Sequence, residues 1–167
     1  MKEKTIYNDS FLDKAIKLIA CVAGIMVIGW LSGMLGGAND GYGSLVRPAF
    51  TPPDIIFSIV WPVLYALMGV SLYLIISDKT LNDEGRIASI LIFTLQLALN
   101  VSYTPVFFKL QAYLFAFVIL ALLCATVTAL IIINFRLNKA SALLLLPYIA
   151  WLFFAVYLNA GIVALNG

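Results

Sequence analysis

Five long apolar stretches divide this 167-residue chain, and each is about as long as a helix that crosses a bilayer. A bilayer core about 30 Å thick takes about 20 helical residues at a rise of about 1.5 Å each. The stretches are continuous and do not alternate with polar residues, which disfavours a closed β-barrel. We therefore predict an all-α integral membrane protein, a single domain of five transmembrane helices in one bundle, with approximate spans 18–38, 55–77, 87–108, 110–135 and 140–166 and a long first loop over 39–54.

The charged and metal-ligating residues exclude several classes of function. Only 11% of the residues are charged, against roughly 25% in a soluble domain. The absence of histidine excludes His-ligated metal or haem and a Ser/His/Asp group, and both cysteines lie inside apolar runs. No charged residue lies in the middle of a span, which disfavours an ion-coupled pump. We expect no metal site, no required cofactor and no nucleic-acid partner.

The distribution of lysine and arginine predicts the orientation. Eight of the ten lie on one side of the predicted bundle and two on the other, and positive loops stay in the cytoplasm. This places the N-terminus in the cytoplasm of a bacterial plasma membrane, with the first loop and the C-terminus outside. The first apolar run is too long for the core of a cleaved signal peptide, so we expect it to remain as a span. The eight residues are Lys2, Lys4, Lys14, Lys17, Lys79, Arg86, Arg136 and Lys139, and the two are Arg47 and Lys109.

Small residues recur every four positions on two of the spans. Such stripes let helix backbones approach closely in a bilayer, where lipid replaces water as the solvent. Two interpretations stay open for each stripe, namely packing inside one five-helix bundle and the seam of a homodimer. The stripes are Gly29, Gly33 and Gly37 on the first span and Ala121, Ala125 and Ala129 on the fourth.

Three prolines lie inside predicted spans. A proline lacks a backbone N–H and leaves the carbonyl four residues earlier without its helical partner. We expect these spans to kink there or to line something polar. The prolines are Pro62, Pro105 and Pro147, and the freed carbonyls belong to Ser58, Val101 and Leu143.

Polar and aromatic residues inside the spans converge on one depth. Helical periodicity and a rise of about 1.5 Å per residue place them on three faces in the outer half of the bilayer, beneath the first loop. Interhelical hydrogen bonds alone or a cavity for a flat, largely apolar ligand would both explain them. A mid-span indole favours the cavity, because its N–H is costly against lipid. The faces carry Trp61 and Tyr65 on the second span; Gln96, Asn100, Tyr103 and Phe107 on the third; and Tyr148, Trp151, Ala155 and Asn159 on the fifth.

Three motifs cover the chain from about residue 42 to its end. They are, in chain order, Arg47-Pro48-Ala49-Phe50-Thr51-Pro52-Pro53 continuing to Trp61 and Tyr65; Gln96-Leu97-x-Leu99-Asn100 followed by Pro105-x-Phe107-Phe108; and Pro147-Tyr148-x-x-Trp151-x-x-Phe154-Ala155-x-x-Leu158-Asn159. In this order and spacing the chain resembles the translocator protein family, also called tryptophan-rich sensory proteins or peripheral-type benzodiazepine receptors. It is similar to the bacterial members.

The resemblance implies a five-helix bundle, usually a homodimer, with a pocket beneath the first loop. Ligands of such relatives are porphyrins and haem and, in animal members, cholesterol and synthetic drugs. The ligand-binding residues that we expect here are Tyr42, Pro52, Trp61, Tyr65, Gln96, Asn100, Tyr103, Thr104, Trp151 and Ala155.

This chain departs from the family pattern at three places. Ile55 and Tyr103 stand where aromatic-rich members have tryptophan, so ligand preference can differ. The C-terminal sterol-recognition pattern needs a lysine or arginine after a tyrosine, and none follows Tyr157.

Three functional hypotheses follow from this sequence. The first is a membrane protein that binds a tetrapyrrole, porphyrin or haem, and acts as a sensor, carrier or stress regulator. The second is an enzyme that degrades porphyrin in light, for which Trp61 and Trp151 are the only candidate catalytic residues. No acid–base pair or activated nucleophile is available to it. The third is a structural dimer without a specific ligand.

Overall fold

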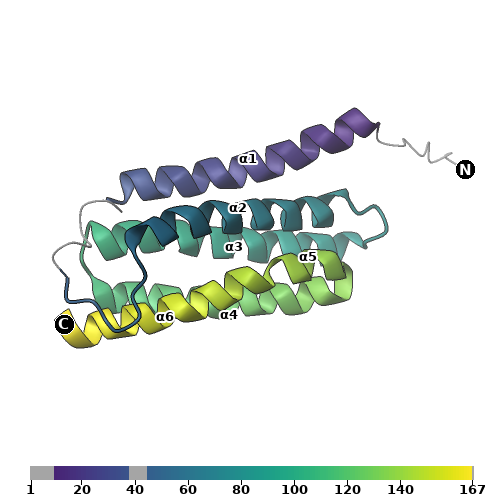
Figure 1. Cartoon of the computed structure of the whole chain (residues 1–167). Coiled ribbons are helices and arrows are strands. Elements are labelled where there is room, and N and C mark those ends of the chain that lie inside the picture. The colour runs from purple at the N-terminus through teal and green to yellow at the C-terminus, as the bar shows by residue number, and fades with distance from the viewer. Residues whose placement is uncertain (1–9, 38–44, 167) are drawn as a thin grey trace, which may run out of the picture.

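The computed structural model describes residues 10–37 and 45–166 (Figure 1). Five segments of these residues are long and apolar enough to cross a membrane. Helices α1 to α4 form one span each, and α5 and α6 together form the fifth, Lys139–Asn166. The predicted all-α bundle of five transmembrane helices is confirmed, and the described residues contain no strand. The helices are α1 (Phe11–Leu35), α2 (Asp54–Ser77), α3 (Asp83–Phe108), α4 (Tyr113–Leu137), α5 (Lys139–Leu144) and α6 (Leu146–Asn166).

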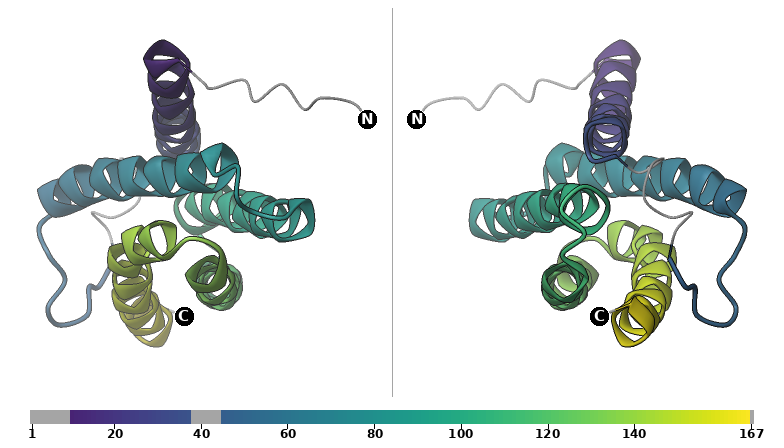
Figure 2. Two further views of the ribbon diagram at one scale, coloured as in Figure 1. Left: turned by 90° about the vertical axis from the view of Figure 1, so that its right-hand side faces the viewer. Right: turned by 90° about the vertical axis from the view of Figure 1, so that its left-hand side faces the viewer.

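The helices run roughly parallel to one long axis, with α1 on the outside. Figure 2, viewed along the bundle, shows α1 on the far side of α2 and α3 from α4 and α6. α1 contacts α2 and α3, whereas α4 contacts α3, α5 and α6. We call the end that carries the α1–α2 connection and the C-terminus the loop end, and the other the opposite end. The central core therefore lies between α2, α3, α4 and α6.

Three helices begin several residues away from the predicted positions, two of them because a polar side chain caps the first turn. α1 begins at residue 11 rather than 18, since the Ser10 hydroxyl accepts from the Asp13 backbone N–H and the Asp13 carboxylate accepts from the Ser10 N–H. α3 begins at residue 83 rather than 87, with the Asn82 side chain as its cap. α4 begins at residue 113 rather than 110 because Gln111 has a φ of 51°, which a helix does not allow. Hydropathy alone misses such polar first turns.

The three prolines behave differently. Pro62 and Pro105 lie within continuous helices, whereas Pro147 follows a break at Leu145 that separates α5 from α6. The carbonyl of Val101, which Pro105 leaves free, accepts a hydrogen bond of 3.0 Å from the Ser32 hydroxyl of α1. The hydrogen bond that the Val101 carbonyl lacks within α3 is thus replaced by one from α1, which joins the two helices.

The two stripes of small residues have different surroundings. A side chain at Gly29 would collide with the ring of Tyr65, and one at Gly36 would come within 2.7 Å of the Thr104 methyl, so α1 approaches α2 and α3 closely there. Gly33 faces open space. On α4, in contrast, all three alanines of the stripe are exposed, namely Ala121, Ala125 and Ala129.

A cluster of buried serines and asparagine joins four helices toward the opposite end. Ser71 of α2 and Ser141 of α5 have their hydroxyl oxygens 2.8 Å apart, and each hydroxyl also lies 3.0 Å from the other residue's carbonyl. The Asn134 amide of α4 donates to the Ser141 hydroxyl at 2.9 Å and accepts from Ser89 of α3 at 2.7 Å. We call these four residues the Ser–Asn cluster, and none of their side-chain polar atoms is without a partner.

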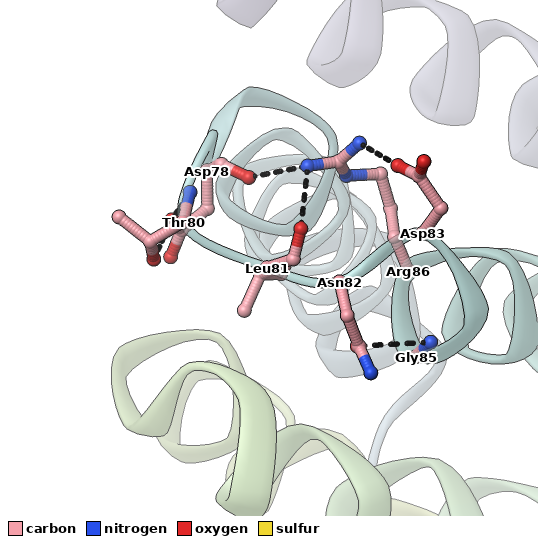
Figure 3. A network of polar contacts seen from close by, with 7 residues as sticks. All are labelled: Asp78, Thr80, Leu81, Asn82, Asp83, Gly85 and Arg86. Atoms are coloured by element: carbon pink, nitrogen blue, oxygen red, sulfur yellow. Dashed lines mark hydrogen bonds and ion pairs between the residues drawn. The ribbon is translucent and has the colours of Figure 1, made fainter.

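The α2–α3 loop closes the same end with a polar network (Figure 3). Arg86 donates to the carbonyl of Asp78 at 2.8 Å and forms an ion pair with Asp83 at 3.1 Å. The Asp78 carboxylate accepts from the hydroxyl and backbone N–H of Thr80 and from the Asn138 amide, and Arg86 lies nearby. These interactions lower the pKa of Asp78 below its ordinary value, the Thr80 hydroxyl contributing most.

Candidate functional site

Four buried side chains form a chain of hydrogen bonds between α2, α3 and α6. The Tyr65 hydroxyl donates to the Asn100 carbonyl oxygen at 2.9 Å, and the Asn100 amide donates to the Tyr148 hydroxyl at 2.8 Å. Tyr148 in turn donates to Gln96 at 3.2 Å. None of the four is more than 9% exposed. We call them the central cluster.

Aromatic rings surround the central cluster. Trp61 stacks on Tyr65 with ring centroids 5.5 Å apart, and Trp151 meets the edge of Phe57 at 5.7 Å. Trp61, Trp151 and Ala155 all pack against the buried core that contains Tyr65 and Tyr148. The tryptophan that faces outward is Trp30 of α1, which is 64% exposed. Trp61 and Trp151 are both half-buried, and each packs against the bundle core on one side.

A second polar contact lies nearer the loop end. The Asn159 amide of α6 donates to the Tyr103 hydroxyl of α3 at 3.1 Å, and the Tyr103 ring stacks on Phe107 at 5.5 Å. Asn159 is 1% exposed. This contact extends the polar face of α3 and α6 beyond the central cluster.

Three buried polar atoms at this site have no hydrogen-bond partner among the described residues. They are the amide nitrogen of Gln96, the indole nitrogen of Trp151 and the amide oxygen of Asn159. The other two such atoms in the described residues, on Ser77 and Arg86, lie at the opposite end. An unpaired buried donor or acceptor costs about 1–3 kcal/mol, so the site offers two donors and one acceptor to an incoming molecule.

The described part of the first loop is fastened to α6. Asn166 donates to and accepts from the backbone of Val46, both at 2.9 Å, and the Tyr157 hydroxyl donates to the Ala49 carbonyl at 2.8 Å. Arg47 and Asp54 form an ion pair of 2.8 Å across the loop. Residues 45–53 are thus tied to the half of α6 that carries Asn159 and Asn166.

An apolar groove opens between α2 and α6 beside Trp151. It has a volume of about 490 Å³ and is lined by apolar side chains of both helices together with the indole. The sequence argument placed a cavity between the second, third and fifth spans. This groove instead opens between α2 and α6, and of the expected binding residues that the structure describes only Trp151 lines it.

Comparison with known proteins decides the family. The sequence pattern described as the TspO/MBR family matches residues 19–165. The chain belongs to the TspO/MBR family.

A tryptophan-rich protein TspO of Archaeoglobus fulgidus is 35% identical over 153 residues, which are 90% of this chain and 97% of that protein. A protein of the same name from Chlorobaculum tepidum is 35% identical over 125 residues, 75% of this chain and 78% of that protein. The human translocator protein is 33% identical over 118 residues, 71% of this chain and 70% of that protein. The resemblance drawn from the three motifs is confirmed.

The structure brings most of the expected family pocket residues into contact with one core. Tyr103 and the two pocket tryptophans pack against it, whereas Pro52 lies half-buried in the fastened loop. Thr104 lies away from it, with its methyl group near Gly36 of α1. Tyr42 falls outside the described residues. The residues that join the core are Trp61, Tyr65, Gln96, Asn100, Tyr103, Trp151 and Ala155.

Two residues of the site are absent from the expected list of binding residues. Tyr148 is the central link of the hydrogen-bonded chain, and Asn159 carries one of the three unpaired atoms. The signal for both was present, because they lie on the same face of the fifth span as Trp151.

Proposed function

We propose that this membrane protein binds a flat, hydrophobic ligand of the tetrapyrrole class, porphyrin or haem, between α2, α3 and α6. Its role is that of a sensor, carrier or stress regulator in the membrane. The observation that supports the proposal is the group of three unpaired polar atoms, on Gln96, Trp151 and Asn159, among aromatic rings in the bundle. A site that only packed helices would be expected to pair these atoms.

The chemistry of the site suits a ligand with a broad apolar face and a few polar groups. The rings of Trp61 and Trp151 offer faces and edges on which a macrocycle can stack. The two donors suit carboxylate or carbonyl oxygens, and the Asn159 oxygen suits a pyrrole N–H. Because the chain has no histidine, recognition rests on the ring and its substituents and not on an iron ligand.

A titration of the protein in lipid nanodiscs with protoporphyrin tests the proposal. Binding is followed by the porphyrin absorbance, which does not depend on the number of indoles in the variant. The chain has three tryptophans, so Trp30→Phe serves as the matched control for Trp61→Phe combined with Trp151→Phe. We expect saturable binding by the wild type and the control, and affinity reduced about tenfold or more in the double variant. Equal affinity in all three proteins would remove the site from this location.

The homodimer is also a proposal, and α4 is its proposed seam. The glycine stripe of α1 is partly used inside the chain, whereas Ala121, Ala125 and Ala129 are all exposed on α4. We expect Ala125→Cys copies in vesicles to cross-link to each other, and Ala160→Cys copies, on the exposed side of α6, to remain monomeric. Cross-linking at Ala160 alone would move the seam to α6.

The proposed orientation puts the loop end outside the cell. Among the described residues the loop end carries only Arg47 and Lys109 as cations, while the remaining lysines and arginines lie toward the opposite end. In a chain without its native cysteines, a membrane-impermeant maleimide applied to intact cells should label Phe50→Cys and leave Thr80→Cys unlabelled. The reverse pattern would invert the bundle.

A further inference from the structure

The groove between α2 and α6 lies in the middle of the membrane span. Val63 and Leu67 line it from α2, and Pro147 and Ala150 line it from α6. The α2 span covers residues 54–77 and the fifth span residues 139–166, so these positions are far from both ends. Water is absent at such depth, and only acyl chains or a molecule dissolved in the bilayer can fill the groove.

Trp151 separates this groove from the central cluster. Its ring lines the groove and also packs against the core that contains Tyr65 and Tyr148. Leu64, which is 3% exposed, lines the groove as well and belongs to the same core. Val60 also lines the groove and packs against that core, so one indole, one leucine and one valine are shared between the groove and the interior.

The backbone beside Trp151 has a built-in break. The α5–α6 junction at Leu145 leaves the regular helix, and Pro147, which lines the groove, cannot donate a backbone hydrogen bond. α5 is held by the Ser–Asn cluster through Ser141, and the far half of α6 is held by the loop through Asn166. Between these two attachments α6 is also held by the hydrogen bonds of Tyr148 and Asn159. The Trp151 side chain, whose indole N–H has no partner, is therefore the part that can move without breaking a hydrogen bond.

We propose that a hydrophobic ligand enters the central cluster from the bilayer through the α2–α6 groove, with Trp151 as the movable partition. The inference rests on the proposed function, because it describes how that same ligand reaches its site. Movement of the Trp151 indole away from the core that contains Tyr65 would open a path from the groove to the central cluster. The ligand does not need to pass the loop end, where residues 45–53 are fastened to α6.

The chemistry of the groove favours a ligand over a lipid chain as its occupant. Its volume of about 490 Å³ lies within the range of small-molecule sites, about 300–1,000 Å³. The indole N–H of Trp151 is buried without a partner. It meets the occupant only when the indole moves, and an acyl chain has no atom that can accept its hydrogen bond. A tetrapyrrole has both the apolar face for the groove and oxygen or nitrogen acceptors for the N–H.

Dissociation kinetics in nanodiscs test this route, because a ligand leaves by the path through which it enters. Protoporphyrin bound to the protein is chased with excess haem, and its release rate and equilibrium affinity are measured separately. Ala150→Phe fills the groove from α6, and Val63→Phe fills it independently from α2. Ala160→Phe places the same ring on the exposed side of α6, away from the groove, and is the matched control.

We expect both groove variants to release protoporphyrin about tenfold more slowly than the wild type and the control, with equilibrium affinities within about twofold of each other. Unchanged release rates in both variants would overturn the route while leaving the proposed function intact. A release rate and an affinity that change together would make the groove part of the binding site or a lipid site, and would also overturn it. Absence of saturable protoporphyrin binding by the wild type would instead remove the proposed function itself.

Discussion

The Ser–Asn cluster and the central cluster are both buried groups of polar side chains in an apolar bundle, yet they differ in how completely their hydrogen bonds are made. In the Ser–Asn cluster the hydroxyls of Ser71, Ser89 and Ser141 and the amide of Asn134 all have partners. At the central cluster Gln96 keeps an unpaired donor, and Trp151 beside it keeps another.

The difference indicates separate roles for the two regions. A fully paired polar cluster in a low-dielectric interior fixes the helices that it joins. An incompletely paired one lowers the stability of the unliganded protein and gains most when a ligand supplies the missing partners. We therefore propose stability as the role of the Ser–Asn cluster and binding as the role of the central cluster, and the two can be tested against each other.

The largest effect is expected for Asn134→Ala. This change leaves the Ser89 hydroxyl without its acceptor and removes the donor to Ser141, two buried hydrogen bonds at once. We expect it to lower the free energy of unfolding by about 2–4 kcal/mol, measured by denaturant titration in mild detergent. Protoporphyrin affinity of the folded fraction should stay at the wild-type value. A large loss of affinity with unchanged stability would reverse the assignment.

Gly29→Ala tests the comparison at the central cluster, because Gly29 packs against Tyr65. The added methyl group collides with the Tyr65 ring, which must move away from its hydrogen bond to Asn100. We expect a loss of about 1–3 kcal/mol together with weaker ligand binding.

Gly33→Ala is the matched control, because a methyl group at Gly33 meets nothing within 4 Å. Its unfolding free energy should stay within about 0.5 kcal/mol of the wild type. Equal losses for the two glycines would show that the contact with Tyr65 is not the cause.

Gln96→Met removes an incompletely paired side chain from the central cluster. The change deletes the acceptor of Tyr148 but also the unpaired amide nitrogen, and Tyr148 keeps its bond from Asn100. We expect stability to change by at most about 1 kcal/mol while ligand affinity falls about tenfold. A stability loss as large as that of Asn134→Ala would mean that both clusters are structural.

The smallest effect is expected at Asp78, which accepts from Asn138 at the edge of the Ser–Asn cluster. Its folded pKa is lowered, chiefly by the Thr80 hydroxyl, so the carboxylate stabilises the fold fully above the ordinary aspartate pKa. That contribution is lost as the pH falls through the lower, folded pKa. Asp78→Asn should reduce the acid-induced loss of stability, seen in unfolding curves at a series of acidic pH values, and a curve unchanged by the substitution would contradict this.

The sequence predicted the membrane spans and put Trp61 and Trp151 on the same helix faces as Tyr65 and Tyr148, because hydropathy and helical periodicity act within one span. It did not predict the α1 start, which depends on the Ser10 cap, nor the Ser–Asn cluster. The serines of that cluster are isolated in apolar runs, and only tertiary packing brings Ser71 next to Ser141. The partnering of the Val101 carbonyl by Ser32 of α1 likewise depends on how α1 packs.

The most direct test of binding at the central cluster is the shift in unfolding free energy that protoporphyrin causes. At a free concentration of about 100 times its dissociation constant, a ligand that binds only the folded protein stabilises it by about 2.7 kcal/mol. We predict this shift for the wild type and for Ser71→Ala in the Ser–Asn cluster, and a much smaller shift at the same concentration for Trp61→Phe combined with Trp151→Phe. A full shift in the double tryptophan variant, or none in the wild type, would contradict the account.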